Sequence, residues 1–267
     1  MACRRMLLHP ATRGLDLDDP RTTIHRREII RKRKFLRHVY REWYGRLVAA
    51  LPPGDGPVVE LGSGPGFLAE VVTGAITSDV LPLPGVRALM DGCALPFADG
   101  TLRAILMTNV FHHLPSVKAF LREAARSLRS GGVVAMVEPW LTRWSSYVYT
   151  HWHHEPFDPD VRWLELATAH PLSSANGALA WIVFERDRAA FGTEFPLLGV
   201  RSIEPLMPFS YLLSGGFSAP SIAPAWSFRF WRRVEQAVRP LERGLAMFAV
   251  IVLERSSQAR DSDHRNP

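Results

Sequence analysis

The chain has 267 residues, enough to bury a full hydrophobic core, and this length fits one elaborated domain better than two independent ones. Hydrophobic residues make up 47% of it and eight residues are tryptophan, which excludes a largely disordered chain. The two cysteines, Cys3 and Cys93, lie too far apart in sequence to suggest a disulfide framework. No apolar run has the length of a signal peptide core or of a membrane span, which needs ~20 residues. We therefore expect a cytoplasmic protein.

Basic residues are concentrated near the start of the chain. The formal net charge is +6, and ten Lys and Arg residues lie between Arg21 and Arg46, where only two acidic residues offset them. Apolar residues recur there at the spacing of one helix face: Leu36, Tyr40, Trp43 and Leu47. We expect a helix that packs this face on the domain and leaves a basic face in solvent. Peripheral contact with an anionic membrane through residues 21–47, or contact with nucleic acid, is the alternative.

After a turn-rich break at residues 51–57, short apolar segments alternate with helical ones. We expect strands at residues 57–61, 75–78, 86–90, 102–108 and 133–137. Helices are expected at residues 67–72 and 116–128. The less regular residues 141–197 indicate an insertion. The remainder predicts strands at 200–203 and 247–253 around a helix at 226–245.

Polar residues follow the predicted strands at their carboxyl ends. They are Glu60, Asp79, Asp91, Asn109 and Glu138. Alternating strands and helices predict a parallel sheet, and ligands of open α/β sheets bind in the crevice outside the carboxyl ends of the strands. We therefore expect a ligand site at this edge of the sheet.

A glycine-rich turn follows the first predicted strand, where residues 58–67 read VVELGSGPGF. Gly62, Gly64 and Gly66 permit backbone conformations with φ > 0 and a close approach of the backbone to a ligand. In the dinucleotide fingerprint the third glycine would come one residue later. The carboxylate of Glu60 also suits an amino or hydroxyl group better than a phosphate. Both departures argue against a dinucleotide site.

Four motifs in order resemble the class I S-adenosylmethionine (SAM)-dependent methyltransferases, in particular the small-molecule group that includes the ubiquinone and menaquinone C-methyltransferases. The matching residues are Glu60–Gly66, Asp91 with Leu95-Pro96-Phe97, Asn109–Leu114 and Leu128–Gly132. The resemblance covers about residues 57–138. It implies a Rossmann-like, doubly wound and mostly parallel sheet of seven strands, carrying an N-terminal helical cap and an insertion after the fifth strand. The expected parts are a basic helical cap (1–50), a SAM-binding core (51–140), an insertion or lid (141–197) and a C-terminal part that completes the sheet (198–267).

The resemblance also implies which residues bind the cofactor, SAM. Gly62, Ser63 and Gly64, together with Gly66, would line its methionine part, and Glu60 would lie beneath its amino group. Asp79 would accept hydrogen bonds from the ribose, Asp91 and Gly92 would lie at the adenine, and Asn109 would lie near the sulfonium.

The chain departs from the family pattern in two places. Only eleven residues separate Asp79 from Asp91, and Pro82, Pro84 and Gly85 are among them, so we expect no helix between those strands. Leu102-Arg103 also replaces the aromatic-Asp pair common before the fourth strand.

His112 and His113 follow the fourth strand, next to the expected point of methyl transfer. A hydroxyl acceptor needs a general base whose pKa is near the working pH, and histidine provides one. We therefore expect one of the two histidines to act as a base or to contact the substrate. The alternative is that one packs in the core and the other caps the loop.

A second histidine-rich segment, His151-Trp152-His153-His154-Glu155-Pro156, does not match the zinc-binding histidine-Glu-x-x-histidine helix. We expect no metal there and interpret the segment as a lid or as packing. The tryptophans of the insertion favour an apolar acceptor pocket as much as an ordinary core.

The sequence thus predicts a methyltransferase that transfers a methyl group from SAM to a small, apolar or amphipathic acceptor. A SAM-binding or scaffolding protein without catalysis is one alternative. Nucleic-acid methylation is another, disfavoured because Asn109 is not followed by the Pro-Pro-aromatic run of many base-modifying relatives.

Overall fold

The computed structural model describes residues 19–152, 155–163 and 175–257. Its centre is a seven-stranded sheet with the strand order β3-β2-β1-β4-β5-β7-β6. The strands are β1 (Val58–Leu61), β2 (Ile76–Asp79), β3 (Ala88–Leu89), β4 (Leu102–Thr108), β5 (Leu128–Pro139), β6 (Leu198–Leu206) and β7 (Phe248–Arg255). The first five strands pair in parallel, and β7 runs antiparallel to both β5 and β6. The expected mostly parallel, doubly wound sheet is confirmed.

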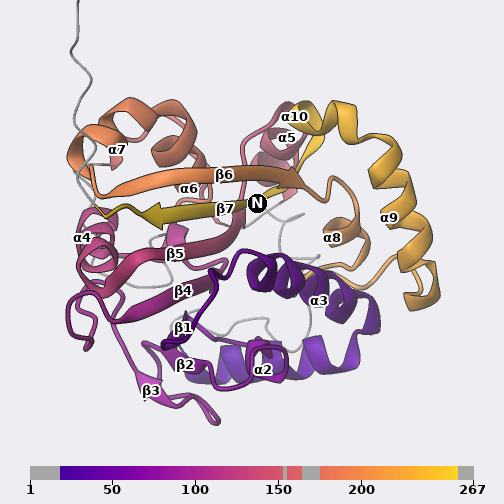
Figure 1. The fold of residues 1–267 in the computed structure, drawn as a ribbon. Coiled ribbons are helices and arrows are strands. Elements are labelled where there is room, and N and C mark those ends of the chain that lie inside the picture. The colour runs from indigo at the N-terminus through magenta and orange to yellow at the C-terminus, as the bar shows by residue number, and fades with distance from the viewer. Residues whose placement is uncertain (1–18, 153–154, 164–174, 258–267) are drawn as a thin grey trace, which may run out of the picture.

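Helices cover both faces of the sheet (Figure 1). Those on one face are α2 (Pro20–Lys32), α3 (Lys34–Ala49), α5 (Arg143–Trp152), α8 (Ser210–Leu213) and α9 (Phe228–Ala237). Those on the other face are α4 (Val117–Ser127), α6 (Leu179–Trp181), the π-helical segment Ile182–Arg186 and α7 (Arg188–Glu194). The short α10 (Glu242–Leu245) leads into β7. Alternate residues of each strand point to opposite faces, so Ile105 and Met107 lie in one core and Ala104 and Leu106 in the other.

Within residues 19–50, the described part of the N-terminal cap, two helices occur where the sequence predicted one. Arg33 adopts an extended conformation (φ −90°, ψ 92°) between α2 and α3, and its guanidinium donates to Gly216 O and Ala219 O. The apolar residues predicted for one face, such as Leu36 and Trp43, are fully buried against the sheet. The packed arrangement is therefore confirmed, and these apolar residues are not available to a lipid surface.

Other predicted helices are shorter than expected. The predicted helix at 67–72 is a single 3₁₀ turn, Leu68–Glu70. The predicted helix at 226–245 is divided, because Pro240 in the 3₁₀ turn Arg239–Leu241 lacks an N–H and ends the regular helix. Residues 80–87 contain no helix, as the prolines and the short spacing predicted.

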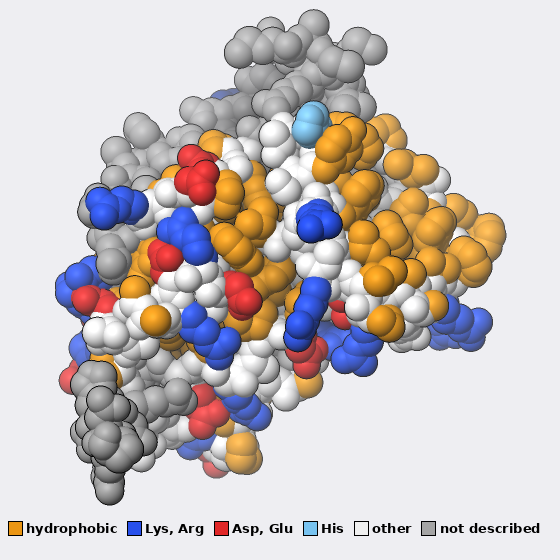
Figure 2. Space-filling view, turned by 90° about the horizontal axis from the view of Figure 1, so that it is seen from above, with side chains coloured by type: hydrophobic (Ala, Val, Ile, Leu, Met, Phe, Trp, Pro, Cys, Tyr) orange, Lys and Arg blue, Asp and Glu red, His pale blue; other side chains and the backbone are white. Residues whose placement is uncertain are grey.

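Lysine and arginine side chains are interspersed with acidic ones on the face of the molecule in Figure 2, while apolar side chains gather at one side of it. Among the exposed apolar residues of the chain are Trp226 and Phe230, near the start of α9. No helix among the described residues is both long and apolar enough to cross a membrane.

Candidate functional site

A cavity of about 190 Å³ lies at the carboxyl ends of β1, β2 and β4. Eight of the residues predicted for the site line it: Gly62, Gly64, Asp79, Asp91, Gly92, Asn109, His112 and His113. The N-terminal helices contribute Thr23, Arg26 and Tyr40 to its wall, and later segments contribute residues such as Tyr149, Glu155 and Tyr211. Gly62 and His113 are 51 positions apart in the sequence, yet the parallel strands bring both to one crevice, as the strand-end pattern predicted.

The glycine turn forms one wall of this first cavity. Gly62 has φ +62°, and a Cβ at this position would lie 2.5 Å from Val110 Cγ2, so both conformation and space require glycine. Gly64 also lies in the left-handed region (φ +46°), and its N–H donates to Asp79 Oδ2 at 2.9 Å. These contacts hold the turn of β1 against the end of β2.

The remaining residues of the glycine motif line a second cavity of about 510 Å³, which lies behind the turn and against α2. There Ser63 donates its hydroxyl to Glu60 Oε2 at 2.6 Å. A Cβ on Gly66 would lie 2.4 Å from Tyr44 Oη, so Gly66 is required for packing against α3. Glu60, Ser63 and Gly66 are therefore placed on the opposite side of the turn from the strand-end residues.

In the turn, the pKa of the Glu60 carboxyl group is shifted from its ordinary value. Burial raises its pKa to about 7, although the hydroxyl of Ser63 and the guanidinium of Arg27 act in the opposite direction. Arg27 of α2 also donates to Gly64 O at 2.7 Å. The second cavity thus contains contacts that hold the turn in place.

Asp79 and Asp91 lie at the ends of neighbouring strands but are held differently. Asp79 is buried, and its two oxygens accept hydrogen bonds from Gly64 N–H and from Leu81 N–H, the latter at 3.0 Å. Asp91 is exposed and accepts from Cys93 N–H at 2.8 Å. Each carboxylate keeps lone pairs that can accept hydrogen bonds from a ligand.

Asn109 follows β4 with a left-handed backbone (φ +56°), a conformation that asparagine tolerates better than most residues. Its N–H donates to Val137 O at 2.9 Å, and its side chain hydrogen-bonds the phenol of Tyr40. This places Asn109 between the sheet and the N-terminal cap.

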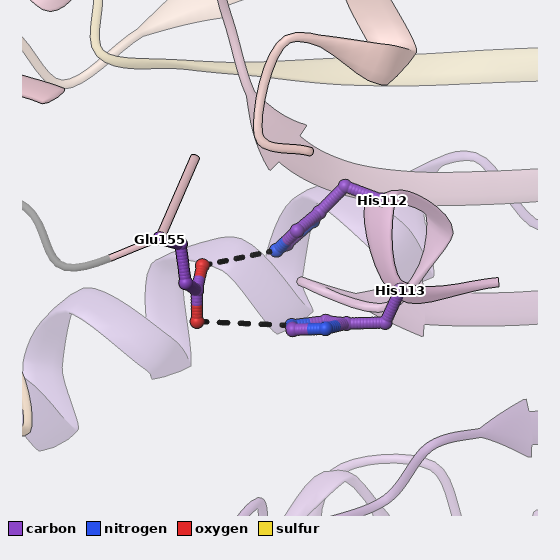
Figure 3. A group of neighbouring side chains, drawn as sticks. All are labelled: His112, His113 and Glu155. Carbon is purple, nitrogen blue, oxygen red and sulfur yellow. Dashed lines mark ion pairs between the residues drawn. The ribbon is translucent and has the colours of Figure 1, made fainter. Parts of the chain in front are cut away.

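Three further lining residues of the first cavity lie close together: His112, His113 and Glu155 (Figure 3). His112 Nε2 lies 3.5 Å from Glu155 Oε2, and His113 Nε2 lies 4.0 Å from Glu155 Oε1. On its far side, His112 Nδ1 lies 2.6 Å from Glu138 Oε2. We call His112, His113 and Glu155 the histidine–glutamate cluster.

Glu138 anchors this cluster to the sheet. It is fully buried at the end of β5, and its Oε1 accepts hydrogen bonds from Val110 N–H and Phe111 N–H, both at 2.8 Å. Burial of His112 by itself lowers the pKa of the imidazole, but the carboxylates of Glu138 and Glu155 together raise it to about 10. In the absence of another cation, His112 therefore holds its proton at neutral pH and is poorly suited to act as a base.

Comparison with known proteins supports the fold and the resemblance to methyltransferases. Residues 59–136 match a family model described as a methyltransferase domain. An uncharacterized methyltransferase of Mycobacterium sp. (strain KMS) is 33% identical over 98 residues, which are 32% of this chain and 39% of that protein. A homologous protein of strain JLS is 32% identical over the same length.

Solved structures resemble the whole chain more distantly. A complex between the Trm112 methyltransferase activator of Haloferax volcanii and a methyltransferase matches with 16% identity, covering 87% of this chain and 94% of that one, at a TM-score of 0.50. Geranyl diphosphate C-methyltransferase from Streptomyces coelicolor A3(2) has 16% identity, covering 93% and 88%, at a TM-score of 0.48.

Residues 59–136 thus resemble the domain of class I SAM-dependent methyltransferases. The matched segment runs from β1 to β5 and includes the glycine turn, both strand-end aspartates and the histidine pair. The chain matches about two fifths of the length of its curated relatives. The likeness to the solved structures, at this identity, concerns the fold.

The first cavity is also lined by residues outside the matched segment that the sequence did not single out. Arg26 lines the first cavity, its guanidinium lies 5.7 Å from the ring centre of Phe217, and its buried Nε has no hydrogen-bond partner among the described residues. Its sequence position gave no signal, because nine other basic residues surround it between Arg21 and Arg46. Glu155 was noticed only as part of the segment interpreted as a lid.

Proposed function

We propose that this protein transfers the methyl group of SAM to a small acceptor that binds beside the histidine–glutamate cluster. One observation carries the proposal. A single cavity is lined both by the glycine turn, the strand-end carboxylates and Asn109 and by the cluster. A cofactor lying along the strand ends would direct its reactive carbon toward an acceptor at the cluster. Here SAM would supply an activated methyl group, while the protein binds, orients and excludes water.

The residues at the strand ends fit SAM. Gly62 and Gly64 line the cavity and adopt the positive φ angles of the turn, which suits the methionine part. We assign Arg26 to the carboxylate of that part, because it is a cation on the cavity wall with a buried N–H that has no hydrogen-bond partner among the described residues. A guanidinium binds a carboxylate through charge-assisted hydrogen bonds.

Asp79 and Asp91 suit the nucleoside. The buried carboxylate of Asp79 is held rigidly by two backbone N–H groups and can still accept from ribose hydroxyls. Asp91 and Gly92 lie farther along the same wall and would receive the adenine. Glu60, Ser63 and Gly66 have a different role in this proposal: they hold the turn from behind.

The acceptor end of the cavity is aromatic, with one polar corner. Tyr149, Tyr211 and Phe248 line it, and the cluster forms the corner. Ligand sites of this kind are largely apolar with a few placed polar groups. We infer a small, amphipathic acceptor whose polar group faces His113 and Glu155. Since Tyr149 and Glu155 come from the predicted insertion, they support its role as a lid.

Calorimetric titration of the full chain with SAM and with its demethylated product tests the cofactor site. We expect micromolar binding of both. Arg26→Gln should weaken it by ~10–100-fold, which corresponds to the loss of a charge-assisted hydrogen bond. Lys32→Gln is the matched control. It removes the same charge from the same helix at an exposed position and should leave the affinity for SAM unchanged.

Absence of binding by folded protein would contradict the proposal. Equal SAM affinity in Arg26→Gln and the parent would show that Arg26 does not bind the SAM carboxylate. The assignment of the cavity to SAM would still stand. Tight binding of SAM with no transfer to any phenol, quinol or lipid acceptor would favour the alternative of a SAM-binding protein without catalysis.

A further inference from the structure

The geometry of the histidine–glutamate cluster is unusual for a set of hydrogen bonds. Hydrogen bonds between nitrogen and oxygen span ~2.7–3.2 Å, whereas the two contacts to Glu155 are 3.5 Å and 4.0 Å long. Both carboxylate oxygens nevertheless face an imidazole nitrogen (Figure 3). The Glu155 carboxylate therefore faces both imidazoles without closing on either of them.

This spacing suits three ligands of one metal ion. Ligands about 2.1 Å from a metal lie ~3.0–3.4 Å from one another in octahedral or tetrahedral geometry. One ligand atom from each of His112, His113 and Glu155 lies within 4.8 Å of the others. A movement of each side chain by about 1 Å toward the common centre would give a metal-binding arrangement.

Glu138 provides the support that metal-binding histidines usually have. A histidine ligand commonly donates its second ring N–H to a carboxylate, which fixes the ring and its tautomer. His112 Nδ1 lies 2.6 Å from Glu138 Oε2, and this leaves Nε2 toward Glu155. Glu138 is itself fixed by two backbone N–H groups of the loop that carries the histidines.

We propose that His112 Nε2, His113 Nε2 and the Glu155 carboxylate bind one divalent transition-metal ion at the acceptor end of the cavity. This refines the expectation of no metal at residues 151–155, because only Glu155 comes from that segment and both histidines come from the loop after β4. Two imidazoles and one carboxylate favour Zn²⁺, Co²⁺, Fe²⁺ or Mn²⁺ over Mg²⁺, which prefers oxygen ligands.

The proposal also specifies the acceptor class, and in that part it rests on the proposed function. Three protein ligands leave coordination positions open toward the cavity, as in catalytic rather than structural sites. A divalent ion lowers the pKa of a hydroxyl group that it coordinates. The acceptor would then present a hydroxyl oxygen to the ion and release its proton to solvent. The oxygen would form a bond to the methyl carbon as the bond from that carbon to the sulfonium sulfur breaks, and demethylated SAM would leave as a neutral thioether. O-methylation would thus be favoured over transfer to an unactivated carbon.

Metal-stripped full-length protein, titrated with Co²⁺ and with Zn²⁺, tests the site. We expect one ion per chain by calorimetry and, for Co²⁺, visible absorption bands that report its coordination by protein. Glu155→Gln and His113→Gln should each weaken binding by about 100-fold or more, since each removes a direct ligand, and Glu138→Gln by ~10–100-fold. His151→Gln is the matched control, because His151 is exposed on α5 and hydrogen-bonds only the local Tyr147 O among the contacts described.

The outcomes separate the two proposals when SAM is titrated into the same preparations. No metal binding by a protein that binds SAM would overturn the metal site and leave the proposed function standing. Metal binding that survives in both Glu155→Gln and His113→Gln would also overturn it, because the ion would then be held elsewhere. Loss of binding in these two variants, with SAM affinity and folding retained, would support it.

Discussion

The two cavities on either side of the glycine turn show how differently neighbouring residues of one motif are used. Gly62 and Gly64 face the first cavity, where the strand-end aspartates and Asn109 also lie. Ser63 and Gly66, only one or two positions away, face the second cavity together with Glu60. Neighbouring residues of one motif thus line two different cavities.

The difference follows from the local geometry of the turn. Positive φ angles at Gly62 and Gly64 reverse the direction of the backbone within three residues. Ser63, between them, is directed back toward Glu60 and the carboxyl end of β2, where its N–H donates to Ser78 O at 2.8 Å. We infer that the first cavity receives the ligand and that the second contains the supports of the turn. Substitutions on the two sides should consequently have different effects.

The largest effect is expected at the wall of the first cavity. Gly62→Ala would place a methyl group 2.5 Å from Val110 and force a left-handed backbone on a residue with a Cβ. We expect a loss of about 2–4 kcal/mol in the free energy of unfolding and at least a ~30-fold loss of SAM affinity. Urea unfolding and calorimetry measure the two quantities. Parent-like values would contradict the conformation described for the turn.

Behind the turn, Glu60→Gln should change stability in a pH-dependent way. The pKa of Glu60 is raised from 4.5 to about 7 in the folded protein. Between these pH values Glu60 keeps a proton in the folded protein that it has lost in the unfolded chain. The contribution of Glu60 to the free energy of unfolding therefore falls as pH rises. The loss is complete above pH ~7 and amounts to about 3 kcal/mol.

The variant lacks this titration, so its stability relative to the parent should improve as pH rises from about 5 to 8. Urea unfolding at several pH values measures the difference. Because Glu60 does not line the first cavity, SAM affinity should change by less than about tenfold in the variant. A loss as large as that of Gly62→Ala would instead place Glu60 at the cofactor.

The smallest effect is expected at a glycine that neither cavity uses. Gly45 lies inside α3, next to Tyr44, and a Cβ there would meet no atom within 4 Å. Gly45→Ala should stabilise the protein by about 0.5–1 kcal/mol, because it restricts the unfolded chain and favours the helix. Thermal unfolding detects this change. The result also gives the effect on stability of adding one methyl group away from the ligand site.

The sequence alone determined much of the domain. Period-two and continuous apolar patterns located β4 with its observed bounds and β1, β2 and β7 within one or two residues. The glycines identified the turn, because a positive φ at Gly62 or Gly64 is a local requirement. Strand-end polar residues predicted one common crevice. Asp79, Asp91 and Asn109 line the first cavity, whereas Glu60 lines the second and Glu138 lines neither.

Tertiary structure decided what depends on contacts between distant segments. The direction of Glu60 into the second cavity depends on the packing of α2 and α3 behind the turn. Arg26 reaches the first cavity only because α2 crosses the strand ends, and Glu155 meets His112 only because the chain returns after α5. Residue patterns report local conformation and the burial of a face, since these act over a few neighbouring positions. They do not indicate which remote side chains share a cavity, because the packing of the complete chain determines which side chains meet.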